Sequence, residues 1–560
     1  MKYSEYPYKR ANIKELKLKT EGLIKKFNAA KNVQEQINII YEYQKTQKEI
    51  SSFSSIAHLN FARNTKDINS KKENEYYNQI NPEIKAIDNL FIKTLNKSKF
   101  KKELIQKFGK HYFNLIDMEL KSFDPKMIDL MKKENDLIND YNTLIANAEI
   151  KFNGKTLNLT GLAAYKQDVN RDIRKKAFKA TNDFFLKNEE KLDSIFDKLV
   201  KIRHNKSQVI GLKNFTPLGY LNMNRSDYGP KEVKEYRKQI VKHIVPIAEK
   251  IKEKRRKKFN YKKMYCYDTL FFQEGNPKPK GNKDHLVKQA QKMYKELSPE
   301  TDEFFNIMIN ENLMDLENRP GKRGGGFCTS FPSLERPYIF ANFNGTDHDV
   351  TVLTHEAGHA FQCYQSRKQP LDKYLWPTYE ACEIHSMSME FLTWEWMNLF
   401  FQEDTKKFLY KHLCDSLTTL PWLAIVDHFQ HWIYENPFAS PKERKQEWRN
   451  LEKIYFPSLN YDDLNFFNNG GRWQQQLHIY NLPFYYIDYS LAQVCAFQFW
   501  IKMQENKKEA WEDYLRLCKA GGSMSFLDLV KLANLKSPFD PKVFEQVASK
   551  ISKWISENNM

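Results

Sequence analysis

His355, Glu356 and His359 form an HExxH pattern, in which two histidines four residues apart flank a glutamate. On a helix, positions i and i+4 lie on one face, so both imidazoles can bind one metal ion while Glu356 faces the water at that ion. Zinc lowers the pKa of its bound water to about 7, and Glu356 can take the proton as the water attacks a carbonyl carbon. The pattern therefore predicts a zinc-dependent hydrolase.

The residues around this pattern favour a buried helix. Apolar residues recur near helical spacing on both sides of the motif, and no proline interrupts the segment before Pro370. HExxH also occurs by chance, and two ordinary core histidines on a buried helix are then the alternative. A third ligand separates the two interpretations.

Glu383 is the candidate third ligand. Metzincins carry glycine and histidine at the third and sixth positions after the second histidine, but this chain has Gln362 and Gln365 there, which excludes that class. A carboxylate on a second helix remains, and Glu383 lies in a helical pattern that follows Pro377. Two imidazoles and one carboxylate leave a fourth position open, as in catalytic zinc sites. We expect one Zn²⁺ per chain, bound by Glu383 and the two histidines.

Two further acids share the helical pattern of Glu383. Glu380 precedes it by three residues and Glu390 follows it by seven, so all three lie near one helix face. One acid can bind the metal while another orients a ligand histidine from behind. We expect Glu380 and Glu390 in this orienting role, with plain salt bridging as the alternative.

A later segment, HIYNLPFYYIDY from His478 to Tyr489, adds a histidine and several tyrosines. Together with HEAGH and with EIHSMSME from Glu383 to Glu390, it resembles the thimet oligopeptidase family, most closely its oligoendopeptidase F and Pz-peptidase branch. The resemblance covers the catalytic half by its motifs and the N-terminal half by length and helical character. It implies the same three zinc ligands, with Glu356 as general base.

The resemblance also implies that His478 and the tyrosines flank the substrate. Tyr489 is then the donor to the tetrahedral oxyanion, and Tyr486 lies nearby. A phenol has a pKa of about 10, so it remains a donor at neutral pH and can stabilise an oxyanion. Core packing is the alternative for such an aromatic run in a chain with 30 tyrosines.

A glycine-rich loop precedes the zinc motif. Gly324 to Gly326 lead into two short strand patterns with a turn at Ser333 to Pro337, which predicts a hairpin beside the zinc helix. A strand of this kind can hold an extended peptide by backbone pairing, so Ala341 and Asn342 are candidate substrate contacts, with an ordinary hairpin as the alternative. The loop lacks a following GK[ST], so nucleotide binding is not indicated.

Composition and charge bound the class of protein. The chain has 560 residues, of which 41% are hydrophobic, enough for a large core. Its net charge of +19 raises nucleic acid as a partner, but the densest basic run, Lys250 to Lys258, contains an acid and no aromatics, so we interpret it as a solvated helix face. The N-terminal segment has no apolar stretch typical of a signal peptide, and no apolar stretch is long enough for a membrane span. The seven cysteines are scattered and do not indicate a disulfide framework. We expect a cytoplasmic protein without nucleic acid or membrane partners.

Most of the chain has a helical pattern. An exception surrounds Asn153 and Gly154, where alternating residues predict a β-hairpin. We expect a mainly α fold of two interlocked helical lobes, residues 1–200 and 201–560 with a soft boundary, and a small β element beside the zinc helix. The resemblance adds a deep substrate channel between the lobes, with residues 1–200 on its lid side.

The expected activity is cleavage of internal bonds in short unstructured peptides, by a monomer or homodimer. A preference for collagen-like Gly-Pro peptides follows if the Pz-peptidase affinity holds. A metallo-exopeptidase, such as a peptidyl-dipeptidase or carboxypeptidase, shares the ligands but needs a cationic anchor for the substrate carboxylate, and Arg472 and Lys502 lie near the tyrosine segment. A catalytically silent peptide-binding protein is the alternative from another class.

Overall fold

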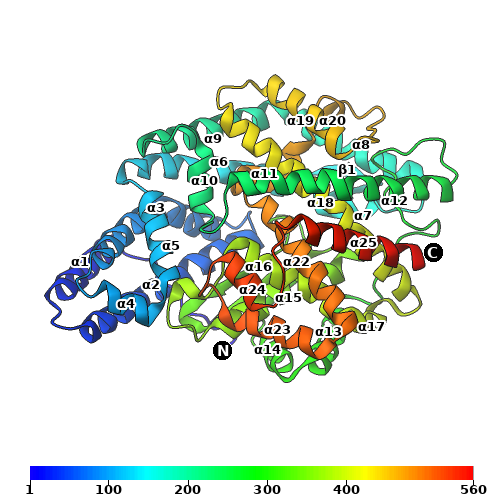
Figure 1. Cartoon of the computed structure of the whole chain (residues 1–560). Coiled ribbons are helices and arrows are strands. Elements are labelled where there is room, and N and C mark those ends of the chain that lie inside the picture. Colours follow the sequence, from blue (N-terminus) through cyan, green and yellow to red (C-terminus); the bar gives the residue numbers. More distant parts are fainter. Residues whose placement is uncertain (559–560) are drawn as a thin grey trace.

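The computed structural model describes residues 1–558, which fold mainly into α-helices with two small sheets (Figure 1). This confirms the expected mainly α fold. The helices before residue 260 are α1 (Ile13–Ala29), α2 (Val33–Arg63), α3 (Ile68–Asn96), α4 (Lys101–Phe108), α5 (Lys110–Lys121), α6 (Ile128–Ala146), α7 (Leu159–Tyr165), α8 (Arg171–Lys187), α9 (Glu189–Val209), α10 (Phe215–Asn222), α11 (Pro230–Gln239) and α12 (Val245–Lys258).

The later helices are α13 (Lys283–Leu297), α14 (Pro299–Asn310), α15 (His348–Ser366), α16 (Tyr379–Leu392), α17 (Asn398–Phe401), α18 (Thr405–Glu435), α19 (Pro441–Tyr455), α20 (Asn465–Asn468), α21 (Leu477–Asn481), α22 (Tyr486–Glu505), α23 (Lys507–Ala520), α24 (Phe526–Leu532) and α25 (Pro541–Glu557). The strands are β1 (Ile150–Phe152), β2 (Lys155–Leu157), β3 (Met314–Glu317), β4 (Phe327–Phe331) and β5 (Arg336–Phe343).

Local sequence signals explain where several of these elements begin. Asn12, Asn32 and Asp67 precede α1, α2 and α3, and each side chain accepts a hydrogen bond from a backbone N–H of the first turn. The expected hairpin is also present, because β1 and β2 pair antiparallel around Asn153 and Gly154, whose φ angles are 50° and 75°. Positive φ at both central residues is typical of a two-residue hairpin turn.

The second sheet lies beside the candidate zinc helix, and its strand order is β3-β5-β4. β4 and β5 form the antiparallel hairpin that the sequence predicts, with Phe327 opposite Phe340 and Phe331 opposite Arg336. β3 pairs with the other side of β5 in parallel. β5 is therefore the central strand, and β4 and β3 are the edges.

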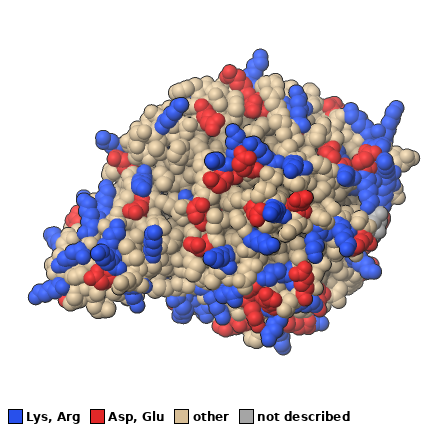
Figure 2. Space-filling view, in the orientation of Figure 1, with Lys and Arg blue, Asp and Glu red and all other residues tan. Residues whose placement is uncertain are grey.

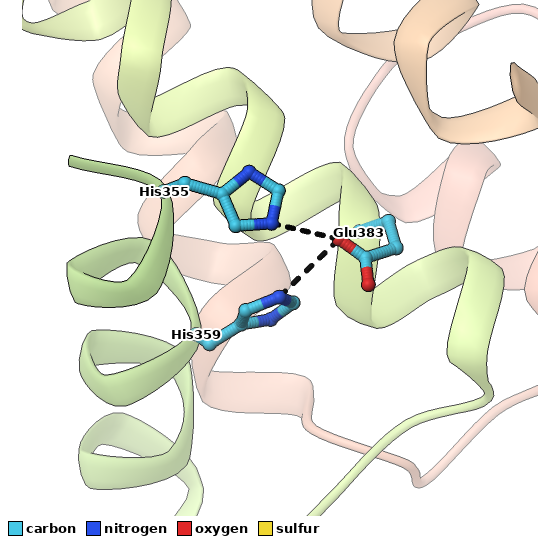
Figure 3. Close-up of side chains that lie close together, drawn as sticks. All are labelled: His355, His359 and Glu383. Atoms are coloured by element: carbon cyan, nitrogen blue, oxygen red, sulfur yellow. Dashed lines mark ion pairs between the residues drawn. The ribbon is translucent and has the colours of Figure 1, made fainter. Parts of the chain in front are cut away.

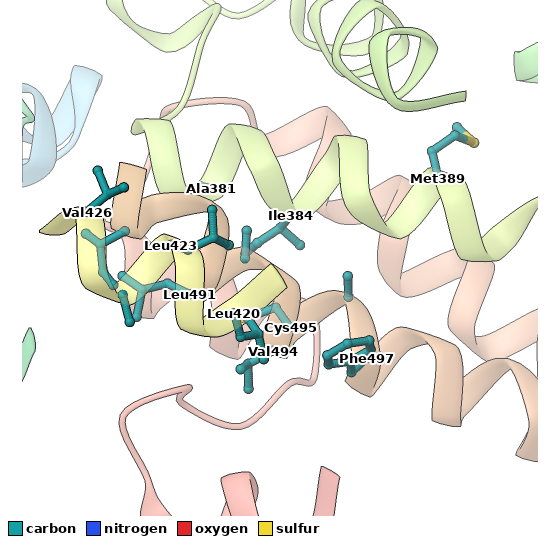
Figure 4. Close-up of a cluster of buried hydrophobic side chains, with 14 of the residues drawn as sticks. Ala381, Ile384, Met389, Leu420, Leu423, Val426, Leu491, Val494, Cys495 and Phe497 are labelled. Atoms are coloured by element: carbon teal, nitrogen blue, oxygen red, sulfur yellow. The ribbon is translucent and has the colours of Figure 1, made fainter. Parts of the chain in front are cut away.

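The helices that carry the motifs pack in a row. α15 packs against β5 and against α16, α16 packs against α22, and α22 packs against α18. Figure 4 shows the apolar side chains that fill the space between α16, α18 and α22, among them Ala381, Ile384, Leu420, Leu423, Leu491 and Val494. Burial of these side chains fixes the helix positions, because a packed core tolerates little change in volume.

The core also joins the two halves of the chain. One buried cluster contains Leu59 and Phe196 as well as Leu491 and Ile551. Residue 200, where the sequence analysis puts the soft boundary, lies inside α9. The division into lobes of 1–200 and 201–560 stays a prediction.

Charged side chains of both signs cover the face seen in Figure 2. The basic run from Lys250 to Lys258 lies on α12, where Arg256 pairs with Glu253 and Arg255 donates to the carbonyl oxygens of Asp268 and Leu270. Part of this run is thus engaged within the chain. Among the described residues, none of the helices combines the length and apolar character of a membrane span.

Candidate metal centre and active site

The three candidate metal ligands converge in the structure. His355 and His359 lie one turn apart on α15, and Glu383 faces them from α16 (Figure 3). The Nε2 atoms of both histidines lie 3.2 Å from Oε2 of Glu383. The three donor atoms all lie within 4.8 Å of one another.

This donor set fits a zinc ion. Zinc bonds of about 2.0–2.1 Å in a tetrahedral arrangement separate neighbouring ligand atoms by about 3.3 Å, close to both nitrogen–oxygen distances. Two imidazole nitrogens and one carboxylate oxygen are also the donors that a catalytic zinc site uses. The side chains are therefore spaced as the ligands of one metal ion.

Gly358 permits the close approach of the two ligand helices. A Cβ atom at this position would lie 2.6 Å from the carbonyl oxygen of His385 and 2.7 Å from Cα of Ser386. Both are main-chain atoms of α16, so a side chain here would push the helices apart. The glycine inside HEAGH thus sets the distance between the histidines and Glu383.

Glu390 orients one of the ligand histidines from behind. Its Oε1 lies 2.7 Å from Nδ1 of His355, and its Oε2 lies 2.8 Å from Nε2 of His412. The indole N–H of Trp394 donates to Nδ1 of His412 at 3.0 Å, so His412 carries its proton on Nε2 and donates to Glu390. A carboxylate that accepts from Nδ1 of His355 leaves Nε2 free for a metal.

Glu380 differs from the sequence expectation. Its Oε1 accepts a hydrogen bond from Tyr228 at 3.0 Å, and it bonds to neither ligand histidine in the described part of the chain. Burial raises its pKa to about 7, against the opposing charge of Arg225. The offset of three residues turns Glu380 toward α10 and α11 instead of toward α15, so only Glu390 occupies the orienting position.

Glu356 lies buried beside the metal ligands. A Cβ atom on Gly326 would lie only 2.9 Å from its Oε1, so the glycine-rich loop fits closely over this carboxylate. Its Oε2 has no hydrogen-bond partner among residues 1–558. Burial raises the pKa of Glu356, and His355 and His359 oppose that shift. A raised pKa suits a carboxylate that must accept a proton near neutral pH.

His478, Tyr486 and Tyr489 form one cluster. The ring of His478 lies 4.8 Å from that of Tyr486 and 5.8 Å from that of Tyr489, between centroids. Gln476 donates its amide N–H to Nδ1 of His478 at 2.7 Å, which leaves the proton on Nε2. Burial lowers the pKa of His478 to about 4 and raises that of Tyr489 well above its usual range. Both groups are thus neutral hydrogen-bond donors at pH 7.

Tyr485 is a site residue that the sequence analysis missed. Its hydroxyl donates to Oε1 of Glu383, the oxygen that faces away from the two histidines. Its ring packs against those of Tyr379 and Tyr489. Tyr485 and Tyr486 are adjacent in the sequence, and the sequence alone does not indicate which of them contacts Glu383.

The expected substrate role of Ala341 stays a prediction. This residue is fully buried in the central strand β5, and its carbonyl oxygen accepts from Nζ of Lys322 at 2.5 Å. The pairing of β5 with β4 ends at Phe340, and its pairing with β3 is irregular between Phe340 and Phe343, so Ala341 lies outside both ladders. The edge strand that contacts α15 is β4.

Asn342 has a different position. Its amide N–H groups donate to the carbonyl oxygens of Arg323 and Gly325, at 2.9 and 2.7 Å. It also lines a cavity of about 360 Å³ beside Glu356. Asn342 therefore holds the glycine-rich loop, and a direct contact with substrate stays a prediction.

Two family models match the chain. The model described as "Peptidase family M3" covers residues 164–548, and "Peptidase M3 N-terminal domain" covers residues 3–123.

A search of solved structures and of curated proteins gives similar relatives. A structure of Pz peptidase A with inhibitor 2 is 45% identical and superposes with a TM-score of 0.98, over 99% of each chain. An oligoendopeptidase F homolog of Borreliella burgdorferi is 28% identical over 412 residues, which is 70% of this chain and 67% of the relative. Oligoendopeptidase F of Lactococcus lactis subsp. cremoris is 23% identical over 437 residues, 73% of this chain and 70% of the relative.

Proposed function

The chain belongs to peptidase family M3, and from this premise we propose that it is a zinc-dependent oligoendopeptidase that hydrolyses internal bonds of short unstructured peptides. The observation that carries the proposal is the convergence of His355, His359 and Glu383, with Glu356 one residue from the first ligand. The names of its relatives support the oligopeptidase activity.

The three ligands would hold the zinc ion. A divalent metal at this position supplies Lewis-acid polarisation of the peptide carbonyl and lowers the pKa of the attacking water. Glu356 takes the proton of that water at Oε2, the buried oxygen that has no partner in the described chain. It then returns the proton to the nitrogen of the departing amine.

Tyr489 and His478 are the proposed donors to the oxyanion of the tetrahedral intermediate. Each is neutral and protonated, Tyr489 on its hydroxyl and His478 on Nε2, so neither needs to change charge as the oxyanion forms. Tyr486 packs against both rings and keeps their orientation. Donors fixed in advance stabilise developing charge at little reorganisation cost.

We also propose that peptides reach the site between the two expected lobes. The cavity beside Glu356 is lined from one side by α6 and α7, before residue 200, and from the other by β5 and α15. A channel at this place admits an extended peptide and excludes a folded domain. Similarity to a Pz peptidase supports tests with Gly-Pro peptides, and a cytoplasmic monomer or homodimer stays a prediction.

Neither of the two cations that an exopeptidase could use to bind the substrate's C-terminal carboxylate is free to do so. Arg472 donates to the hydroxyl of Tyr461 and stacks on Trp422, and Lys502 pairs with Asp513. Each cation is therefore engaged within the protein. Internal cleavage is the activity that the site supports best.

An internally quenched peptide of about nine residues, which spans roughly 30 Å when extended, tests the proposal. Wild type, Glu356→Gln and the surface control Glu335→Gln would be incubated with it, with and without a chelator, and the products mapped by mass spectrometry. We expect internal, chelator-sensitive cleavage that falls roughly 10²- to 10⁴-fold in Glu356→Gln and persists in the control. Terminal trimming would favour an exopeptidase, and binding without cleavage would favour a silent peptide-binding protein.

A further inference from the structure

A cavity of about 360 Å³ lies next to the catalytic residues, and its lining includes neighbours of Glu356 and His478. Three of its lining residues are such neighbours. Gly326 touches the carboxylate of Glu356, Val352 lies one turn before it on α15, and Leu477 precedes His478. The cavity is therefore close enough to the catalytic residues to receive part of a bound peptide.

The cavity carries unbalanced positive charge. Arg323 and Lys166 line it, and neither has a carboxylate within ion-pair distance among residues 1–558. Its one acidic lining residue is Asp349, whose carboxylate accepts from the backbone N–H groups of Asn344 and Gly345, at 2.9 and 2.8 Å. This acid is engaged with the backbone, and one carboxylate against two cations leaves the lining with an excess of positive charge.

Arg323 is unusual among the arginines of the chain. Arg255 and Arg472 also lack an ion pair in the described chain, but Arg255 donates to two main-chain carbonyls and Arg472 to a tyrosine hydroxyl. Within residues 1–558, the only polar side-chain contact of Arg323 is from Nη1 to Nε2 of His58, at 3.0 Å. Burial and the charge of Arg323 lower the pKa of His58 to about 4, so His58 is a neutral partner.

The main chain holds Arg323 in place although its guanidinium is largely unsatisfied. Its backbone N–H donates to the carbonyl of Ala62 at 2.8 Å, and its carbonyl accepts from Asn342 at 2.9 Å. The side chain lies over the ring of Phe327, with 5.6 Å between Cζ and the ring centroid. A fixed, half-buried cation with spare donors is ready to bind an anion.

We propose that Arg323 binds a carboxylate of the peptide substrate and so determines which peptides are cut efficiently. This inference rests on the proposed peptidase function. Peptides carry two kinds of carboxylate, the free C-terminus and the side chains of aspartate and glutamate. Either suits the planar fork of a guanidinium, which can donate two parallel hydrogen bonds.

The test uses one nine-residue sequence in matched forms. One pair differs only in a C-terminal carboxylate or carboxamide, and a second set carries glutamate or glutamine at successive positions around the cleaved bond. Steady-state kinetics would be compared for wild type, Arg323→Gln, Arg323→Lys and Arg256→Gln. Arg256 lies on α12 and pairs with Glu253, so its variant controls for the loss of one positive charge away from the cavity.

We expect wild type and Arg256→Gln to prefer one carboxylate form by roughly tenfold or more in kcat/KM, mainly through KM. Arg323→Gln should remove this preference by lowering kcat/KM for the carboxylate form to that for the neutral form, and Arg323→Lys should restore part of it. The set that shows the preference identifies the source of the carboxylate. A preference tied to a fixed distance from the C-terminus would also reveal exopeptidase character.

Two failures remain distinguishable. If wild type cuts carboxylate and neutral forms equally well, or if Arg323→Gln keeps the preference, the role of Arg323 is refuted while the peptidase function stands. If wild type cuts none of the peptides, the proposed function itself fails. Thermal unfolding of each variant separates a loss of binding from a loss of fold.

Discussion

Tyr485 and Tyr489 stand four residues apart, and among the described residues the hydroxyl group of Tyr485 is the one that donates to a metal ligand. Tyr485 donates to the ligand carboxylate of Glu383, while Tyr489 lies beside the rings of His478 and Tyr486. The first tyrosine therefore acts through the metal ligand. The second is the one available to a reacting group.

This difference predicts distinct effects of two equivalent substitutions. Tyr485→Phe should weaken metal binding roughly 10- to 100-fold, because a hydrogen bond to a ligand is lost. Tyr489→Phe should lower kcat roughly 100-fold or more with little change in KM or metal affinity, because its bond forms mainly in the transition state. Competition with a chelator and steady-state kinetics measure the two effects.

Tyr8→Phe provides the matched control, since that hydroxyl bonds to Glu73 near the N-terminus. It should leave both measurements unchanged. Equal loss of metal affinity in Tyr485→Phe and Tyr489→Phe would contradict the division of roles.

At the scale of elements, the approach of α15 and α16 builds the metal centre. Neither helix holds the three ligands alone, and at Gly358 the two main chains are so close that a Cβ atom would lie 2.6 Å from the carbonyl oxygen of His385. The ligand distances thus depend on a residue that has no side chain and binds nothing.

Gly358→Ala should therefore weaken the metal site although Gly358 is not a ligand. The added methyl group would overlap main-chain atoms of α16, and such overpacking costs about 1–3 kcal/mol. We expect a lower free energy of unfolding and a weaker metal site, measured by denaturant titration and by metal content after dialysis. Gly22→Ala on α1, where a Cβ atom meets open space, should leave the metal content unchanged and should raise the free energy of unfolding by up to about 1 kcal/mol, because alanine favours a helix interior. Full metal content in Gly358→Ala would show that the helix spacing is not decisive.

The spacing of residues along the sequence predicts the motif helices and the hairpin well. It does not predict which distant segments pack against them. The HExxH helix, the Glu383 helix and the β4–β5 hairpin follow from periodicity, proline positions and turn residues. The central place of β5 does not, because β3 joins it from a separate segment of the chain. His412 is missed for the same reason, since it reaches Glu390 from α18.

At the scale of the whole molecule, one buried ion cluster ties distant segments together. Glu134 on α6 pairs with Arg203 and Lys206 on α9, at 2.7 and 2.6 Å. Arg203 also donates to the hydroxyl of Tyr434 and to the carbonyl oxygens of Ile479 and Tyr480. The segment that carries His478 is therefore anchored to helices from the first part of the chain.

Glu134→Gln should destabilise the whole protein in a pH-dependent way. Burial alone would raise the pKa of Glu134, but Lys206 and Arg203 lower it from 4.5 to about 2. A carboxyl with a lower pKa in the folded protein stabilises the fold above its unfolded pKa, and this contribution is lost as the pH falls from about 4.5 toward 2. We expect a loss of about 3 kcal/mol at pH 7, where two buried cations lose their partner.

Urea unfolding across this pH range measures the effect. The difference between wild type and Glu134→Gln should shrink as the pH approaches 2, whereas Glu253→Gln on the surface should match wild type throughout. A difference that stays constant with pH would mean that the charge of Glu134 is not the cause.

The hydrogen-bond chain from His355 through Glu390 and His412 ends on the indole of Trp394. Indole emission depends on the electric field around the ring and on hydrogen bonding of its N–H. A metal that draws electron density from His355 changes that field through the chain. We therefore expect the fluorescence difference between wild type and Trp394→Phe to change when metal is added, without any substrate, so that this one indole can report metal occupancy.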